Sequence, residues 1–194
     1  MTEDIRAFIA IELPDEIKKK LTEIQDFLKS KSGRAPAKWV APESIHLTLK
    51  FLGGISPDTV AGVKGAMEEA AIGTSPFRLG VGGLGVFPNP KRVQVVWAGL
   101  TGDMAALTQL QKDLDTALAA LGFTPESRPF TAHLTLARMR DEASPAEREA
   151  IGKLVESTPF QGRDFGVATF SLMRSQLRRE GAIYSQMASV PLNQ

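Results

Sequence analysis

The stretch Ala-His-Leu-Thr-Leu-Ala-Arg at residues 132–138 contains a tetrapeptide, His-Leu-Thr-Leu, that also stands at residues 46–49. The only two histidines of the chain, His46 and His133, open the two copies. Side chains alternate between the two faces of a β-strand, so the His and Thr of each copy point one way and the leucines point the other. The leucines are typical of a core face. We therefore expect two imidazoles and two threonine hydroxyls to lie on polar strand faces, where a two-fold arrangement brings them together across one cleft.

The composition is that of a globular chain without strong bias. It has 194 residues, 43% hydrophobic side chains and a formal net charge of +1 at pH 7, so we expect a properly buried core. This charge argues against binding of long duplex nucleic acid, which usually needs a basic face. It is compatible with binding of a small anionic ligand. The chain has no cysteine, which excludes disulfides, thiolate nucleophiles and zinc sites of the cysteine type.

The expected location is the cytoplasm. The chain opens without a charged and then apolar leader, and its apolar runs stay below the roughly 18 residues that span a bilayer. The lack of cysteine fits a reducing compartment. We therefore expect a soluble monomer without a membrane partner.

Hydrophobic periodicity and turn residues predict an alternation of strands and helices. The three- and four-residue spacing of leucines up to Leu121 predicts the clearest helix, which Gly122 ends. Ser144 followed by Pro145 predicts a capped helix start. Strands are expected at 5–13, 44–53, 77–86, 92–100, from the second motif to about 139, and at 162–177 and 183–190. Helices are expected at 15–33, 56–72, 102–121 and 144–156, with a short extended piece at 38–40.

The order of these elements repeats. A strand, a helix and the first motif follow one another from residue 5, and a strand, a helix and the second motif follow from residue 92. The sequence therefore predicts a single bilobal domain over 1–194, built from two repeats at about 5–91 and 92–190. Its expected fold class is α+β, with two pseudo-symmetric lobes, each an antiparallel sheet with helices packed on the outside, and an active-site cleft between them.

The residues around the motifs resemble those of the two-histidine (2H) phosphoesterases, and within them the RNA 2′,3′-cyclic phosphodiesterases of the 2′-5′ RNA ligase family. The likeness covers nearly the whole chain. A single tetrapeptide of this kind occurs by chance, but two copies in matched halves are a specific signal. Besides the two motifs, the resemblance is carried by Arg-Ala-Phe at 6–8, Trp39, Phe-Leu-Gly at 51–53, Arg-Pro-Phe at 128–130 and Arg138.

The resemblance implies an enzyme that uses no metal and no cofactor and hydrolyses 2′,3′-cyclic phosphate ends of RNA to 2′-phosphomonoesters. It implies His46 as the proton donor to the leaving oxygen and His133 as the proton acceptor from water, with Thr48 and Thr135 completing the site. RNA ends or small cyclic nucleotides would be the substrates. Ligation of 2′-5′ linkages would be the same chemistry run backwards.

The residue types themselves suit this chemistry. With an unperturbed pKa near ~6.5, imidazole is available as acid and as base at one pH, and threonine hydroxyls donate hydrogen bonds to phosphate oxygens. Three alternatives stay open. In the first, the histidines are structural polar residues at strand ends whose hydrogen bonds are made within the protein. In the second, they bind zinc, for which a third ligand is missing. In the third, the cleft belongs to a binding module that holds RNA ends or nucleotides without hydrolysing them.

Substrate contacts by Arg138, Phe51 and Arg128 are less defined. Alternation from His133 puts Arg138 on the opposite face unless the strand bulges, and Phe51 shares the phase of the core leucines, with base stacking as the alternative. Further arginines lie in or beside the last turn, namely Arg174, Arg178 and Arg179. We interpret this turn as a solvated loop rather than as a guide for an RNA end.

Overall fold

A computed structural model of the chain describes residues 4–33, 35–177 and 182–193. The first half contains β1 (Ile5–Glu12), α1 (Asp15–Lys31), β2 (Ala37–Trp39), the short 3₁₀ turn η1 (Pro42–Ser44), β3 (His46–Ile55), α2 (Thr59–Ala71) and β4 (Phe77–Phe87). The second half contains β5 (Val95–Gly102), α3 (Met104–Ala119), β6 (Leu134–Met139), α4 (Pro145–Glu156), β7 (Gln161–Val167), β8 (Thr169–Leu177) and β9 (Ala182–Pro191).

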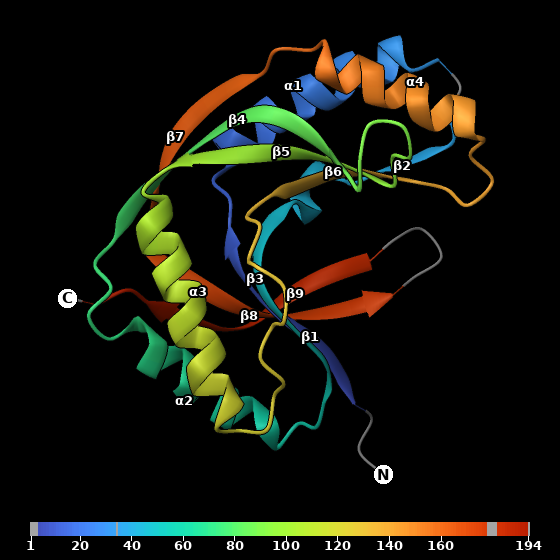
Figure 1. The fold of residues 1–194 in the computed structure, drawn as a ribbon. Coiled ribbons are helices and arrows are strands. Elements are labelled where there is room, and N and C mark those ends of the chain that lie inside the picture. Colours follow the sequence, from blue (N-terminus) through green and yellow to red (C-terminus); the bar gives the residue numbers. More distant parts are fainter. Residues whose placement is uncertain (1–3, 34, 178–181, 194) are drawn as a thin grey trace.

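The strands form two sheets in which every neighbouring pair is antiparallel. One sheet has the order β3-β1-β8-β9 and the other the order β2-β6-β5-β4-β7. Helices α1 and α4 lie over the five-stranded sheet, whereas α2 and α3 pair beside the four-stranded sheet (Figure 1). The predicted α+β architecture is confirmed.

Each sheet takes strands from both sequence repeats. The four-stranded sheet combines β1 and β3 with the last two strands of the chain, and the five-stranded sheet combines β2 and β4 with β5, β6 and β7. Helix α1 follows a strand of the first sheet but packs on the second. The buried Gln25 of α1 fixes this crossing, since its Nε2 donates to the carbonyls of Val40, at 2.8 Å, and Leu136, at 2.9 Å.

The prediction of one strand over 162–177 was wrong. The chain forms β7 up to Val167 and starts β8 at Thr169, and these strands belong to different sheets. At the break, the carbonyl of Ala168 accepts a hydrogen bond from the backbone N–H of Leu192. Strand β7 ends with buried and exposed residues in alternation, and β8 contains four consecutive buried residues. Both patterns are typical of strands, so the sequence does not mark the change of sheet between them.

Local signals in the sequence explain the helix ends. In α4, the backbone N–H of Glu147 donates to the hydroxyl of Ser144, and the carboxylate of Glu147 accepts from the backbone N–H of Ser144. The capped helix start that Ser144 and Pro145 predicted is confirmed, and Glu147 completes it as a capping box. In α3 the leucines at 107, 110, 114 and 118 are fully buried, as the helical spacing predicted. Among the described residues, no helix is both long and apolar enough to cross a bilayer.

Candidate active site

Both tetrapeptide motifs open into one cleft of about 740 Å³. The side chains of His46 and Thr48 enter it from β3, and those of His133 and Thr135 from the end of the long connection before β6 and from β6 itself. Strands β3 and β6 contact each other although they belong to different sheets. The remaining lining residues are Arg6, Ala7, Phe8, Val40, Ser44, Ile45, Phe51, Gly53, Gly54, Arg138, Ser175, Leu177, Ala182 and Tyr184.

The alternation within each motif places these groups. Leu47 and Leu49 are buried in the core together with Leu134 and Leu136, because these apolar side chains leave water on the face that the helices cover. The intervening His and Thr side chains are left on the opposite face, where they are only partly buried. The two copies of the motif therefore present the same four groups to the cleft.

A backbone carbonyl orients each imidazole in the same way. The Nδ1 atom of His46 lies 2.9 Å from the carbonyl oxygen of Ser44, and that of His133 lies 2.7 Å from the carbonyl oxygen of Thr131. A carbonyl oxygen only accepts hydrogen bonds, so each Nδ1 carries the hydrogen and donates it. In the neutral ring this leaves Nε2 as the atom that takes up a proton. The two Nε2 atoms are thus the pair available for acid and base chemistry.

Aromatic rings surround His46. Phe8 stacks on the imidazole with ring centroids 4.6 Å apart, and Tyr184 meets it edge-on at 5.1 Å. This burial removes water from the charged form and lowers the pKa of His46 to about 4, although the carbonyl of Ser44 and the charge of Glu12 act in the opposite direction. The imidazole of His46 is therefore neutral at pH 7 before an anion binds beside it.

His133 has a different aromatic setting. Phe87 meets its ring edge-on with centroids 5.0 Å apart, and Trp97 is tilted against it at 6.4 Å. Trp97 lies opposite Thr135 in the pairing of β5 with β6, so the indole shares the face that carries the second motif. The site thus has two histidines with equal tautomers in two unequal environments.

A bulge in β3 turns Phe51 into the cleft. Ala10 pairs with Thr48 and Ile9 with Lys50, so Leu49 has no partner across the ladder. Leu49 and Lys50 are both buried, and the next side chain returns to the cleft face, where Phe51 is 65% exposed. The expectation that Phe51 is a core residue was wrong, because an extra residue in a strand reverses the alternation beyond it.

The buried end of this bulge is held by an ion pair. The Nζ atom of Lys50 lies 2.5 Å from a carboxylate oxygen of Asp115 in α3 and donates to the carbonyl of Thr124 at 2.7 Å. The Nζ atom of Lys50 also lies 3.7 Å from a carboxylate oxygen of Glu126. Removing Lys50 would leave the largely buried carboxylate of Asp115 without its cation, which is unfavourable. The pair therefore fixes the part of β3 that directs Phe51.

Strand β6 has the same bulge at the equivalent place. Trp97 pairs with Thr135 and Val96 with Ala137, so Leu136 is left without a partner. Leu136 and Ala137 are both buried, and Arg138 lines the cleft. The alternation predicted the opposite face for Arg138 unless the strand bulged, and the bulge is present.

The other predicted arginines lie elsewhere. Arg128 is exposed in the connection between α3 and β6 and does not line the cleft, and Arg174 is exposed on β8 without lining it. Arg178 and Arg179 lie outside the described residues. Among the residues that the structure describes, no group of three or more His, Asp or Glu side chains is placed to hold a metal ion.

Three residues near the histidines escaped the sequence analysis as site residues. Tyr184 comes from β9, more than 130 positions beyond the first motif, and Phe8 reads as one more apolar residue of a buried strand. Glu12 lies opposite His46 in the pairing of β1 with β3. The only signal for Glu12 was a carboxylate at the end of an otherwise apolar strand.

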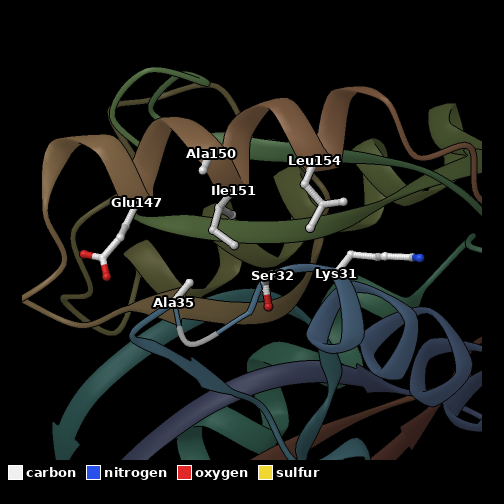
Figure 2. A pocket seen from close by; sticks show the side chains of 7 residues that line it. All are labelled: Lys31, Ser32, Ala35, Glu147, Ala150, Ile151 and Leu154. Carbon is white, nitrogen blue, oxygen red and sulfur yellow. The ribbon is translucent and has the colours of Figure 1, made fainter.

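A smaller cavity of about 260 Å³ lies between α1 and α4 (Figure 2). The side chains of Ile151 and Leu154 point from α4 toward the end of α1, with Glu147 at one end of the cavity and Lys31 at the other. Glu147 is already engaged in the capping box of α4. None of the motif residues borders this cavity, so the cleft between the sheets is the candidate active site.

Comparison with known proteins finds chains of similar sequence and similar fold. The sequence profile of the LigT-like phosphoesterases matches residues 11–97 and 101–184. The RNA 2′,3′-cyclic phosphodiesterase of Methanothermobacter thermautotrophicus is 34% identical over 184 residues, which cover 94% of this chain and 96% of that protein. The crystal structure of TT0787 of Thermus thermophilus superposes with a TM-score of 0.79 at 27% identity, covering 97% of this chain and 98% of that one. The crystal structure of Escherichia coli LigT complexed with 3′-AMP gives a TM-score of 0.77 at 27% identity and covers 99% of this chain and all of that one.

Proposed function

Because this chain belongs to the LigT-like phosphoesterases, we propose that it hydrolyses the 2′,3′-cyclic phosphate at RNA ends to a 2′-phosphomonoester. The curated relatives at 30–34% identity carry the name RNA 2′,3′-cyclic phosphodiesterase. The observation that carries the proposal is the pair of histidines whose Nδ1 atoms are both tied to carbonyls, so that two Nε2 atoms share one cleft with two threonines.

The reaction follows from these groups. His133 Nε2 accepts a proton from water while the water oxygen forms a bond to phosphorus, and the bond between phosphorus and the ribose 3′ oxygen breaks. His46 Nε2 gives its proton to that departing oxygen, which leaves a 2′-phosphomonoester and a free 3′ hydroxyl. Each histidine ends in the state in which the other began, and exchange with solvent restores both.

Hydrogen-bond donors stabilise the charge that develops on phosphorus oxygens. The hydroxyls of Thr48 and Thr135 come from opposite sides of the cleft, so each can donate to one non-bridging oxygen. The guanidinium of Arg138 enters from the second motif strand and adds a charged donor. Phe51 offers an exposed ring in the same cleft, on which the terminal base stacks.

The low pKa of His46 couples its proton to the substrate. In the free protein, burial keeps this imidazole neutral at pH 7. The phosphodiester brings a negative charge next to the ring, and an opposite charge within a few ångströms favours the protonated form. His46 thus takes up its proton with the anion and holds it where the leaving oxygen needs it.

Two imidazoles suffice for the proton transfers, so the proposed reaction uses no metal and no cofactor.

Ligation through a 2′-5′ linkage would use a 5′ hydroxyl in place of water, and it would need high concentrations of RNA ends. A binding module that retains the cleft without turnover is the second candidate, supported by the complexes of E. coli LigT with 3′-AMP and with phosphate.

A single experiment distinguishes the two candidate functions. An oligonucleotide with a 2′,3′-cyclic phosphate end is mixed with the protein, and phosphorus NMR follows the signal of the cyclic phosphate. Hydrolysis predicts its replacement by a single 2′-monoester signal. An unchanged cyclic signal with saturable binding of the oligonucleotide would favour the binding module.

A further inference from the structure

We propose that Lys50 and Asp115 are positioning residues for the proposed reaction, and that this buried ion pair sets where His133 lies relative to His46. Neither Lys50 nor Asp115 is among the described residues that line the cleft, so the pair acts through the segments that it joins. The inference rests on the proposed function, because it concerns the placing of the two histidines on which that reaction depends.

The chain reaches the second histidine through a long connection that begins after α3 and ends at β6 (Figure 1). The carbonyl of Thr124 in this connection accepts a hydrogen bond from Nζ of Lys50 at 2.7 Å. The backbone N–H of Glu126 donates to Oδ2 of Asp115 at 3.0 Å. Among the described residues, every hydrogen bond that joins residues 124–130 to the rest of the protein involves Lys50 or Asp115. The pair is therefore the polar anchor of the segment that precedes the second histidine.

The same pair is fixed to the strand of the first histidine. Lys50 follows His46 by four residues on β3, and its Nζ atom lies 2.5 Å from Oδ1 of Asp115. The two oxygens of one carboxylate thus hold the ammonium of β3 on one side and the backbone of the connection on the other. A single side chain of α3 links the two segments from which the two histidines project.

The bulge in β3 does not explain the charge of Lys50. The equivalent residue of the second motif is Ala137, which also follows its histidine by four residues and also lies next to an unpartnered leucine. Ala137 is fully buried and apolar, and its strand bulges all the same. A lysine is rarely as buried as Lys50 unless it is paired, and an apolar side chain often fills such a place at lower cost. The bulge alone gives no reason for a buried ammonium, whereas the connection does.

The place of the second imidazole sets the geometry of attack. His133 takes a proton from water while the water oxygen forms its bond to phosphorus, and a misplacement of about 1 Å in such a step costs on the order of 10²-fold in rate. The carbonyl that orients this imidazole belongs to Thr131, five residues beyond Glu126 on the same connection. A shift of the anchored segment therefore moves both the carbonyl and the ring. It should lower kcat more than it raises KM.

The test separates positioning from stability. Lys50→Met leaves Asp115 without its cation and should lower both the melting temperature and kcat, with kcat about 10- to 100-fold below wild type. The double variant Lys50→Met with Asp115→Leu removes both charges, and replacing a buried ion pair by apolar side chains is often neutral for stability. We expect its melting temperature to return toward that of the wild type while kcat stays about 10- to 100-fold low, because the connection remains without its anchor. Recovery of kcat together with the melting temperature would overturn the inference.

Two further variants complete the kinetic comparison, in which each protein is assayed well below its melting temperature. Lys50→Arg keeps a cation that can donate to Asp115 and to the carbonyl of Thr124, so it should retain more of kcat than Lys50→Met. Lys64→Met with Glu68→Leu removes an exposed ion pair of α2 that lies outside the cleft, and it should keep the kcat of the wild type. Equal losses in the exposed and the buried pair would contradict a specific role of the buried one.

Proton NMR of the ligand-free protein makes the result independent of turnover. The chain has only two histidines, so their ring signals can be assigned with His46→Gln and His133→Gln. Phe87 and Trp97 lie against the ring of His133, so its signal carries their ring-current shifts. We expect this signal to move in the double variant, and the signal of His46 to move less.

A signal of His133 that stays at its wild-type position in the double variant would refute the inference, even where hydrolysis is confirmed. Absence of hydrolysis by the wild type would instead contradict the proposed function. The NMR comparison would still decide whether the buried pair places the second imidazole.

Discussion

Phe51 and Arg138 hold equivalent positions in the two halves of the cleft. Each follows its motif histidine by five residues, and each is directed into the cleft by a bulge at the last leucine of its motif. The symmetry of the backbone thus presents an aromatic ring on one side and a guanidinium on the other. In the proposed function, the ring contacts the base of the nucleotide and the guanidinium contacts its phosphate.

This pair gives the first prediction. Arg138→Gln should lower kcat/KM for a cyclic-phosphate oligonucleotide about 10- to 100-fold, since a hydrogen bond to a charged group contributes about 1.5–3 kcal/mol and each 1.36 kcal/mol is tenfold. Steady-state kinetics measure the effect. Arg128→Gln removes the same charge outside the cleft, so its rate should stay near that of the wild type. Equal losses in both variants would show that only overall charge matters.

The two histidines should act as a unit. General acid or base catalysis typically contributes 10²–10⁴ in rate, so His46→Ala and His133→Ala should each lose activity on that scale in single-turnover hydrolysis. Their melting temperatures should stay close to the wild type, because both rings lie in the cleft rather than in the main core. The double variant should be much less impaired than the product of the two losses. A single variant that cleaves at a normal rate would refute the acid and base pair.

The threonines should matter less than the histidines. Thr48→Val and Thr135→Val keep the shape of the side chain and remove one donor to phosphate. We expect each to lose about 10- to 100-fold in kcat/KM, in line with about 1.5–3 kcal/mol for a hydrogen bond to a charged group. The same single-turnover assay checks this, and a loss equal to that of a histidine variant would point to an additional role in the proton transfers.

Stability should depend on pH through His46. Its pKa is lowered by burial from 6.5 to about 4 in the folded protein, so the unfolded chain binds more protons between these values. The free energy of unfolding should therefore fall as pH is lowered from about 6.5 to about 4, by on the order of 3 kcal/mol. Urea unfolding at several pH values measures it. His46→Gln should remove this part of the slope, and an unchanged slope in that variant would assign it to other groups.

The pH dependence of catalysis should also carry this pKa. One imidazole must be protonated and the other neutral, so kcat/KM should be bell-shaped. The active form of the free protein holds a single proton on the pair of imidazoles, and a second proton removes the base. The pKa of His46 in the free protein is about 4, so we expect the decline at low pH, where this ring also becomes protonated, to be centred there. Rates across pH 3.5 to 9 with one oligonucleotide test this. A single sigmoid would mean that only one histidine titrates in the step.

Parts of this molecule follow directly from its sequence, and the reason is physical. Alternation in a strand is a local property, so the faces of His46 and His133 could be predicted from four residues. For the same reason the capped start of α4 could be predicted from Ser144 and Pro145. The bulges were not predictable, because the extra residues at Leu49 and Leu136 appear only when the partner strand is known. Phe51 was therefore assigned to the core, and Arg138 could not be assigned to either face.

Contacts between residues far apart in the chain could not be predicted from the sequence either. Tyr184 reaches His46 because β9 joins the sheet of β3 and β1, and no spacing in the chain encodes that neighbourhood. The same holds for Glu12 and Gln186, which are 174 residues apart and share a hydrogen bond. The resemblance to the two-histidine phosphoesterases, in contrast, needed only the paired motifs and their flanks, and the family match confirms it.

The exchange of strands between the sheets bears on how the cleft admits a substrate. The chain changes sheet four times, from β1 to β2, from β2 to β3, from β3 to β4 and from β7 to β8. Hinge closure concentrates its motion in a few residues of a linker, and a pair of lobes joined by four covalent crossings offers no single place for such a hinge. We therefore expect the distance between the two Nε2 atoms to stay nearly constant when a ligand binds in the cleft.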